Sequence, residues 1–283
     1  DYEELQRFAN WLISFEGVNG LVTNGHTGEI FSLSPKERAE VTRAVVEAVG
    51  GKVPVVSGIA VEGIQEGIEQ AGMLKEAGAD GLLVMPFHHW LRVGLSDDHA
   101  VEYFTELGET SGLNLVAHIY PAWTKANYSS GLLGELSKLE WVTTIKLGTR
   151  EMSQYERDIK AIRENGEGVT ILTCHDEYLL ASMVQGVDGA LVGFASFIPD
   201  KIAALYECVK AGDLKGAQEI QELILPLKEA VYASGEPSVE SHARMKTAMY
   251  LSGRLKCDAV RKPIKKPSGE AYQKIQSAVS GAG

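Results

Sequence analysis

Gly78-Ala79-Asp80-Gly81-Leu82-Leu83-Val84-Met85 has a close counterpart later in the chain, Gly186-Val187-Asp188-Gly189-Ala190-Leu191-Val192. In both stretches a glycine-bounded turn leads directly into a short apolar run. Such a turn is typical of the tight connection between a helix and the next strand in a repeated strand–helix unit. The repetition therefore favours a barrel built from such units.

Short apolar segments alternate with longer segments of helical periodicity along most of the chain, which is the pattern of an α/β protein. The expected strands are 18–24, 53–59, 81–85, 113–120, 142–147, 169–173 and 189–194. The expected helices are 2–16, 35–49, 62–77, 97–110, 129–138, 151–164, 177–185 and 199–211. Because helices outnumber strands by one and a helix comes first, we expect an eighth strand upstream of Asp1, missing from the chain as given.

These elements predict an α/β fold, a (β/α)8 TIM barrel, over residues 1–211. Residues 212–283 are expected to form a C-terminal helical extension packed on the barrel, with helices at 214–234 and 238–251 and a basic, proline-punctuated tail at 261–267. The alternative is a doubly wound open sheet. That fold usually carries a glycine-rich phosphate turn after its first strand, and the expected first strand lies outside the sequence.

The composition excludes several classes of protein. A net charge of −11 and a pI near 5.2 argue against a nucleic-acid partner, because phosphates are normally met by clustered Lys and Arg. Three scattered cysteines do not suit a disulfide framework or a zinc ribbon, and they predict a cytoplasmic location. No apolar stretch approaches the roughly 18 residues of a membrane span, so no membrane association is expected.

Polar side chains gather where the expected strands end. In a (β/α)8 barrel the carboxyl ends of the strands build the active site, so residues at these positions are candidates. Five of the seven histidines fall there, namely His26, His88, His89, His118 and His175. Other polar residues at these ends are Tyr120, Lys146, Cys174 and Asp176. The sequence therefore predicts a polar pocket at this end of the barrel.

Lys146 lies in the run 142–148, which otherwise has the composition of a buried strand. A buried ammonium is costly unless it is paired or loses its proton, so burial favours the neutral amine. A neutral lysine amine can attack a carbonyl carbon, which is the requirement of imine catalysis. The alternative is that Lys146 extends to solvent or pairs with Glu29 or Asp176.

Gly25-His26-Thr27-Gly28-Glu29 follows the first expected strand. Its two glycines permit backbone angles at which successive N–H groups converge on an anion, and the Thr27 hydroxyl is a further donor. The loop is therefore a candidate site for a substrate carboxylate, with a plain connecting loop as the alternative. Tyr120 ends its strand and can relay protons through its phenol, although a core tyrosine with a satisfied hydroxyl is equally common.

Taken together, these motifs resemble the dihydrodipicolinate synthase / N-acetylneuraminate lyase family. The loop 25–29 is similar to the carboxylate loop of the family, Tyr120 to its strand-5 tyrosine and Lys146 to its Schiff-base lysine. The segment 187–193 is similar to its glycine-rich turn on strand 8, where the backbone of Leu191 would face the site. Each motif alone is weak, and the ordered set is strong.

The resemblance implies a lyase, aldolase or dehydratase that forms a Schiff base between Lys146 and a 2-oxo acid such as pyruvate or a 2-keto-3-deoxy sugar acid. Thr27, Gly28 and neighbouring N–H groups would hold the carboxylate, Tyr120 would shuttle protons, and Gly148 would line the substrate site. The resemblance implies no cofactor and no metal. It further implies a homodimer or homotetramer.

The departures from the family argue against the biosynthetic synthase reaction in particular. Phe87-His88 stands where the synthases carry paired tyrosines, and 120–125 lacks their arginine. The first threonine of the loop is His26, which can act as acid or base. We therefore expect His26 or His88 to replace the missing relay, and Trp123 to contribute to an aromatic wall against the substrate.

Two functions from other classes remain open. The first is a metal-dependent barrel hydrolase with ligands among His26, His88, His118, His175 and Asp176, although their spacing is not diagnostic. The second is a non-catalytic member of the family that binds a keto acid, which the lost tyrosine and arginine positions suggest.

Overall fold

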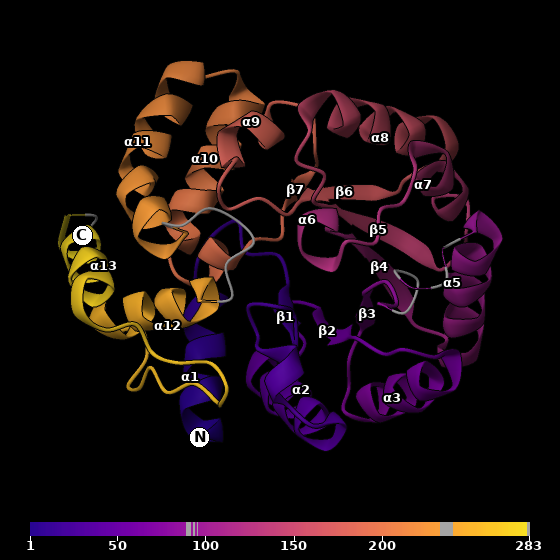
Figure 1. Cartoon of the computed structure of the whole chain (residues 1–283), viewed down its shortest axis with the longest axis horizontal. Helices are drawn as coiled ribbons and strands as arrows, with labels where there is room; N and C mark the ends of the chain where they lie inside the picture. Colours follow the sequence, from indigo (N-terminus) through magenta and orange to yellow (C-terminus); the bar gives the residue numbers. More distant parts are fainter. Residues whose placement is uncertain (89–91, 93, 95, 233–239, 282–283) are drawn as a thin grey trace.

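One parallel sheet of seven strands lies at the centre of the part of the chain that the structure describes (Figure 1). The computed structural model describes every residue except 89–91, 93, 95, 233–239 and 282–283, and it does not describe the side chains of Trp123 and Thr124. The strands are β1 Leu21–Thr23, β2 Val55–Ile59, β3 Gly81–Val84, β4 Asn114–Ile119, β5 Val142–Leu147, β6 Thr170–Thr173 and β7 Gly189–Ala190. They follow one another in chain order, so β1 and β7 form the two edges of a curled, TIM-barrel-like sheet.

Helices surround this sheet on its outer side (Figure 1). Those that follow strands are α2 Pro35–Val49, α3 Ile64–Glu76, α5 Asp97–Ser111, α6 Pro121–Thr124, α7 Ser130–Leu136, α8 Met152–Asn165, α9 Leu179–Met183 and α10 Pro199–Ala211. The others are α1 Tyr2–Leu12 at the start of the chain and α11 Leu214–Val231, α12 Ser241–Leu251 and α13 Gly269–Gly281 at its end. The described residues also include two short 3-10 turns, η1 Ile30–Ser32 and η2 Gly193–Ser196.

The repeated Gly-x-Asp-Gly turn has the same construction in both places. Gly78 and Gly186 have φ values of 93° and 88°, in the left-handed region that favours glycine, and each follows the end of a helix. The carboxylate of Asp80 then accepts from the Val55 amide at 2.8 Å, and that of Asp188 accepts from the Ile171 amide at 2.7 Å. Each turn thus ends a helix and attaches the next strand to the start of its neighbour.

All seven predicted strands are confirmed, but only β5 has the predicted bounds: the first and the last are four residues shorter than expected, and the other four are one or two residues shorter. The last was expected to extend to residue 194, and it ends at Ala190. The physical reason is that the amides of Gly193 and Phe194 donate to the carboxylate of Asp176, at 3.0 and 2.8 Å, rather than to a strand. The chain therefore turns into η2 over the carboxyl end of the sheet.

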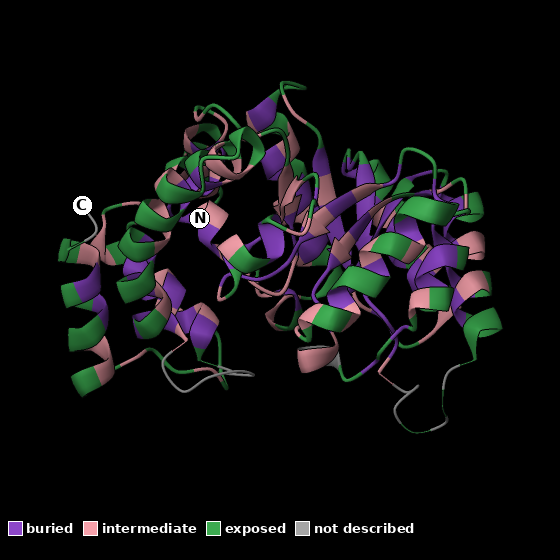
Figure 2. Cartoon of the chain, turned by 90° about the horizontal axis from the view of Figure 1, so that it is seen from above, coloured by how far each residue is buried: buried purple, intermediate pink, exposed green. Residues whose placement is uncertain are grey.

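The C-terminal helices pack against the same apolar core as the strands. Ile224 and Val231 of α11, Met249 of α12 and Ile275 of α13 are buried in one cluster with Ile145 of β5. The helix α13 was not predicted from the sequence. Figure 2 shows the buried residues concentrated along the strands and on the inward faces of the helices.

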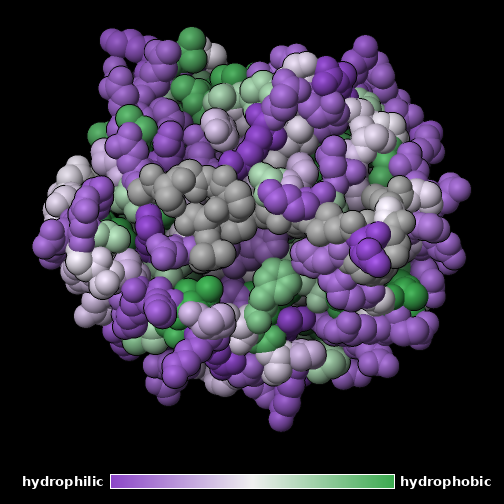
Figure 3. All heavy atoms as spheres, viewed as in Figure 1, coloured by the Kyte–Doolittle hydropathy of each residue, from purple (hydrophilic) through white to green (hydrophobic). Residues whose placement is uncertain are grey.

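The visible face of the surface is mostly hydrophilic, with hydrophobic atoms in small groups (Figure 3). Each helix in the described part of the chain is too short or too polar to span a lipid bilayer.

Candidate active site

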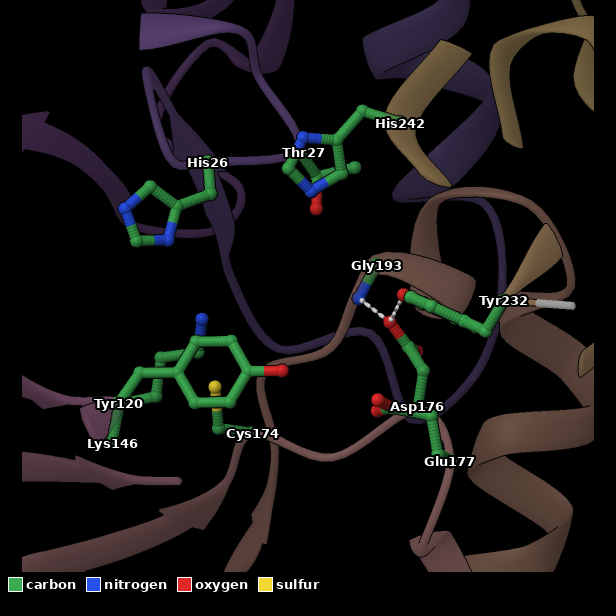
Figure 4. A pocket seen from close by; sticks show the side chains of 10 residues that line it. All are labelled: His26, Thr27, Tyr120, Lys146, Cys174, Asp176, Glu177, Gly193, Tyr232 and His242. Atoms are coloured by element: carbon green, nitrogen blue, oxygen red, sulfur yellow. Dashed lines mark hydrogen bonds between the residues drawn. The ribbon is translucent and has the colours of Figure 1, made fainter. Parts of the chain in front are cut away.

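A pocket lies at the carboxyl ends of the strands (Figure 4), where parallel βα folds build their active sites. Its empty volume, open mouth included, is about 370 Å³. Its walls come from the loop after β1, from residues at and just beyond the ends of β4, β5 and β6, from η2, and from the C-terminal helices. The lining residues are His26, Thr27, Tyr120, Lys146, Cys174, Asp176, Glu177, Gly193, Tyr232 and His242.

Lys146 reaches this pocket from β5. It is paired in register with His118 of β4 and with Leu172 of β6, so the three side chains point to the same side of the sheet. Figure 4 shows its Nζ directed into the pocket, on the side where His26 lies. The lysine is therefore not a surface residue that extends away from the barrel.

The two carboxylates proposed as alternative partners of Lys146 are both engaged elsewhere. Glu29 forms an ion pair with Lys246 of α12 at 2.6 Å. Asp176 accepts from two backbone amides and from the Tyr232 hydroxyl, the last at 2.7 Å. Within the described ranges, no carboxylate oxygen lies within the 4.0 Å of an ion pair with Nζ of Lys146.

Tyr120 follows the last residue of β4 and is largely buried. Its hydroxyl accepts a hydrogen bond of 2.9 Å from the Arg150 guanidinium. Gly148 lies directly against it, since a Cβ added at Gly148 would be 2.6 Å from both the Tyr120 ring and the Ile119 carbonyl oxygen. The loop after β5 thus fixes the tyrosine beside the lysine.

Three imidazoles lie close to Lys146, and all are neutral at pH 7. Burial first, and the charge of Lys146 second, lower the pKa of His26 to about 3 and that of His242 to about 4. The same causes hold the pKa of His118 well below its usual value. Neutral rings can accept a proton or donate an N–H hydrogen bond without adding charge next to the amine.

Cys174 also lines the pocket, in contact with Lys146. Its sulfur lies 3.5 Å from Nε2 of His118. Burial raises the pKa of its thiol to about 11, although a hydrogen bond and the charge of Lys146 act in the opposite direction. The group is therefore a neutral thiol and not a nucleophilic thiolate.

Asp176 is fully enclosed, and burial raises the pKa of its carboxyl to about 6 in spite of the hydrogen bonds that it accepts. The folded protein therefore binds a proton here at pH values at which the unfolded chain, with its ordinary pKa of 3.8, has lost it. It follows that this group lowers the free energy of unfolding as pH rises from about 4 to about 6. Above pH 6 its unfavourable contribution to the free energy of unfolding stays constant.

Asp176→Asn should remove this pH dependence. The difference in the free energy of unfolding between the variant and the wild type should change by up to about 3 kcal/mol across the window, always in favour of the variant as pH rises. Urea unfolding of both proteins from acid to neutral pH measures it, and the comparison cancels the contribution of the buried histidines. A constant difference at all pH values would contradict the raised pKa.

Several residues selected from the sequence lie at this site, and others do not line it. Lys146, Tyr120, Thr27 and His26 line the pocket. His88 is half exposed, and its Nδ1 lies 2.9 Å from the Glu62 carboxylate. Outside the lining set are Gly28, which is exposed, and Leu191, whose side chain packs against Ile30, Leu83, Met85 and Val116. The side chain of Trp123 lies outside the described residues.

Tyr232 and His242 were not expected at the site. They come from the end of α11 and from α12, far along the chain from the strands. Glu177 and Gly193 were also missed. A Cβ on Gly193 would be 2.8 Å from Asp176 and 3.1 Å from the Thr27 hydroxyl, so the turn of η2 approaches the loop after β1 as closely as only glycine permits.

No three His, Cys, Asp or Glu side chains within the described part of the chain are arranged as the ligands of a metal ion. Of the histidines proposed for a metal-dependent hydrolase, His26 and His118 lie near each other, with ring centroids 5.2 Å apart. His88 instead pairs with Glu62, and His175 is buried close to Thr173. The ligand geometry thus gives no support to that alternative.

The fold and the pocket define a TIM-barrel-like enzyme with a lysine and a tyrosine at the carboxyl ends of adjacent strands. Over residues 1–282 the sequence matches the profile described as "Dihydrodipicolinate synthetase family". The chain belongs to this family, as the sequence motifs predicted, and it is an enzyme of the lyase or aldolase type.

Individual relatives agree with this assignment. The chain is 30% identical over 270 residues to an "Uncharacterized DapA-like lyase" of Thermofilum pendens, covering 94% of this chain and 87% of the relative. It is 30% identical over 244 residues to a "4-hydroxy-tetrahydrodipicolinate synthase" of Acidiphilium cryptum, covering 86% and 81%. The fold resembles that of YagE, a prophage protein of E. coli K12 solved in complex with pyruvate, with a TM-score of 0.89, 22% identity and coverage of 100% and 92%.

Proposed function

We propose that this protein forms a Schiff base between Lys146 and a 2-oxo acid, and uses it to cleave or form a carbon–carbon bond or to eliminate water. The observation that carries the proposal is the position of Lys146. Its amine enters the pocket beside Tyr120 and Thr27, with no carboxylate ion-pair partner in the described chain. The pyruvate bound to the E. coli relative supports the same class of substrate.

In the proposed reaction the amine of Lys146 adds to the keto carbon to give a carbinolamine. The Tyr120 phenol gives its proton to the carbinolamine hydroxyl, which leaves as water, so that a protonated imine and a phenolate remain. In cleavage, the phenolate takes the proton of the hydroxyl on the departing carbon. The carbon–carbon bond then breaks, its electron pair passes into the imine to give an enamine, and the phenol is restored.

The loop after β1 is the proposed site of the substrate carboxylate. The Thr27 hydroxyl lines the pocket, and the close approach of Gly193 leaves little space behind it.

We also propose that the seven-stranded sheet corresponds to a (β/α)8 barrel in which a further strand fits between β7 and β1. We propose in addition that the protein acts as a homodimer or homotetramer.

Incubation with pyruvate and borohydride tests the proposal. Reduction of the imine should add the mass of the reduced pyruvate adduct to the peptide that contains Lys146, as mass spectrometry after proteolysis would show. In deuterated solvent the methyl protons of pyruvate should also exchange, because the enamine forms reversibly. Binding of pyruvate without labelling or exchange would instead support a non-catalytic keto-acid-binding protein.

Of the two histidines proposed as a replacement relay, we favour His26, because it lines the pocket while His88 is bound to Glu62. His26→Ala should slow the exchange of pyruvate protons roughly 100-fold. It should alter the acid side of the pH–rate profile, where a group with a pKa of about 3 titrates. His88→Ala should have a smaller effect. Unchanged profiles in both variants would rule out a relay role for either imidazole.

A further inference from the structure

Arg150 contacts the tyrosine of the site directly, although no sequence motif singled it out. It lies on the loop between β5 and α8, four positions after Lys146. One of its terminal nitrogens donates to the Tyr120 hydroxyl at 2.9 Å and to the Glu177 carboxylate at 2.5 Å. The side chain is 23% exposed, so its charge is only partly screened by water.

The guanidinium is held in this position from several directions. Its central carbon lies 5.6 Å from the centre of the Tyr120 ring and 5.8 Å from that of Tyr178, so it is flanked by two aromatic rings. Glu177, whose side chain is 10% exposed, accepts from the same terminal nitrogen that donates to the phenol, and so pairs with the charge of the guanidinium. The hydroxyl of the adjacent Thr149 donates a hydrogen bond of 2.7 Å to the carboxylate of Asp158 in α8, which anchors the loop.

This contact determines how the phenol can use its proton. A guanidinium has donors only, so Tyr120 must act as acceptor toward Arg150. The hydroxyl proton is therefore directed to another group. After the proton has been transferred, the same contact becomes a charge-assisted hydrogen bond from a cation to a phenolate, which is stronger than the bond to the neutral phenol.

We propose that Arg150 is a positioning residue for the proton transfers of Tyr120, in that it orients the phenol proton toward the carbinolamine and stabilises the phenolate that remains. The inference rests on the proposed function of Lys146 and Tyr120. Arg150 gains and loses no proton itself, and the proton passes from phenol to departing hydroxyl and returns from the substrate, as described above. Arg150 thus supplies a hydrogen-bond partner of the phenol from the loop after β5.

Arg150→Met tests the inference with pyruvate alone as the probe. The rates of borohydride labelling and of methyl proton exchange should each fall about 10- to 100-fold, the range expected for a lost hydrogen bond to a charged group. The pH–rate profile should move toward higher pH, because the phenolate loses its cation. The pyruvate concentration at half-maximal rate should change little, and Arg150→Lys should restore part of the rate.

Two comparisons separate positioning from a structural effect. In a Tyr120→Phe background, Arg150→Met should cause no further loss, since the arginine acts through the phenol. Arg157→Met is the matched control, because Arg157 lies on α8 with contacts only to Ser153, Gln154 and Glu151 in the described structure, and it should behave as the wild type.

An unchanged rate and pH profile in Arg150→Met, in a wild type that is labelled at Lys146, would overturn the role of Arg150 and leave the proposed function intact. Full additivity of the two substitutions would overturn it as well. Absence of labelling in the wild type would overturn the proposed function. If Arg150→Met does not fold, as judged by thermal unfolding, Arg150→Lys is compared with the wild type instead. A pH–rate profile that differs from that of the wild type supports the role of Arg150, and an unchanged rate and profile overturn it.

Discussion

Lys146→Ala should abolish both borohydride labelling and the exchange of pyruvate protons. The amine is the atom that becomes covalently bound to the substrate, and no other lysine lines the pocket among the described residues. Removal of the nucleophile in covalent catalysis costs roughly ten thousand-fold or more in rate. Mass spectrometry of the labelled protein and proton NMR of pyruvate in deuterated solvent measure the two losses.

Two further variants complete this experiment. Lys146→Arg keeps the positive charge but offers no amine, and it should be as inactive as the alanine variant. Lys160→Ala removes an exposed lysine of α8 that is paired with Glu164, and it should be labelled at Lys146 as the wild type is. Labelling that persists in Lys146→Ala at another lysine would reject the assignment of the Schiff base.

Gly148→Ala should have the second largest effect. The added methyl group would lie 2.6 Å from the Ile119 carbonyl oxygen and 2.6 Å from the Tyr120 ring, so either the loop or the tyrosine must move. A displacement on the scale of 1 Å at a reacting group costs about 100-fold in rate. The overpacked loop should also lower the free energy of unfolding by about 1–3 kcal/mol, as urea titration would show.

Gly72→Ala is the control for this substitution. Gly72 lies in α3, and a Cβ added there meets no heavy atom within 4 Å. The variant should keep the wild-type exchange rate and gain about 0.5–1 kcal/mol in stability, because alanine loses less backbone entropy in a helix. Wild-type activity in Gly148→Ala would mean that the position of Tyr120 does not limit the reaction.

The extent to which the site could be predicted differs between its two halves. Lys146, Tyr120, Thr27 and His26 lie at or just after strand ends, and hydrophobic patterning locates strand ends well enough to select them. His88 was selected by the same argument, and it lies outside the pocket, bound to Glu62. The position after a strand fixes the end of the barrel at which a residue lies, but not the direction of its side chain.

Short-range sequence signals are sufficient to predict the order of the helices and strands. Glycine in the left-handed region recurs at Gly78 and Gly186 and depends only on nearby residues, whereas the aspartate two positions later accepts from the neighbouring strand 25 or 17 positions earlier. The capping box at Ser34 and Glu37 is likewise local, and both hydrogen bonds of this motif are present. The amino-acid order alone thus specifies parallel strands joined by helices, and the lysine at the end of one of them.

The rest of the site depends on contacts between residues that are distant in the chain. Tyr232 and His242 enter the pocket because α11 and α12 pack on the core, and Arg150 meets Tyr120 and Glu177 across 30 and 27 positions. The pKa values of His26 and His242 are likewise lowered mainly by burial, which is a property of the packed chain. Such contacts leave no periodic or local pattern, since packing of whole elements, and not sequence neighbours, brings the groups together.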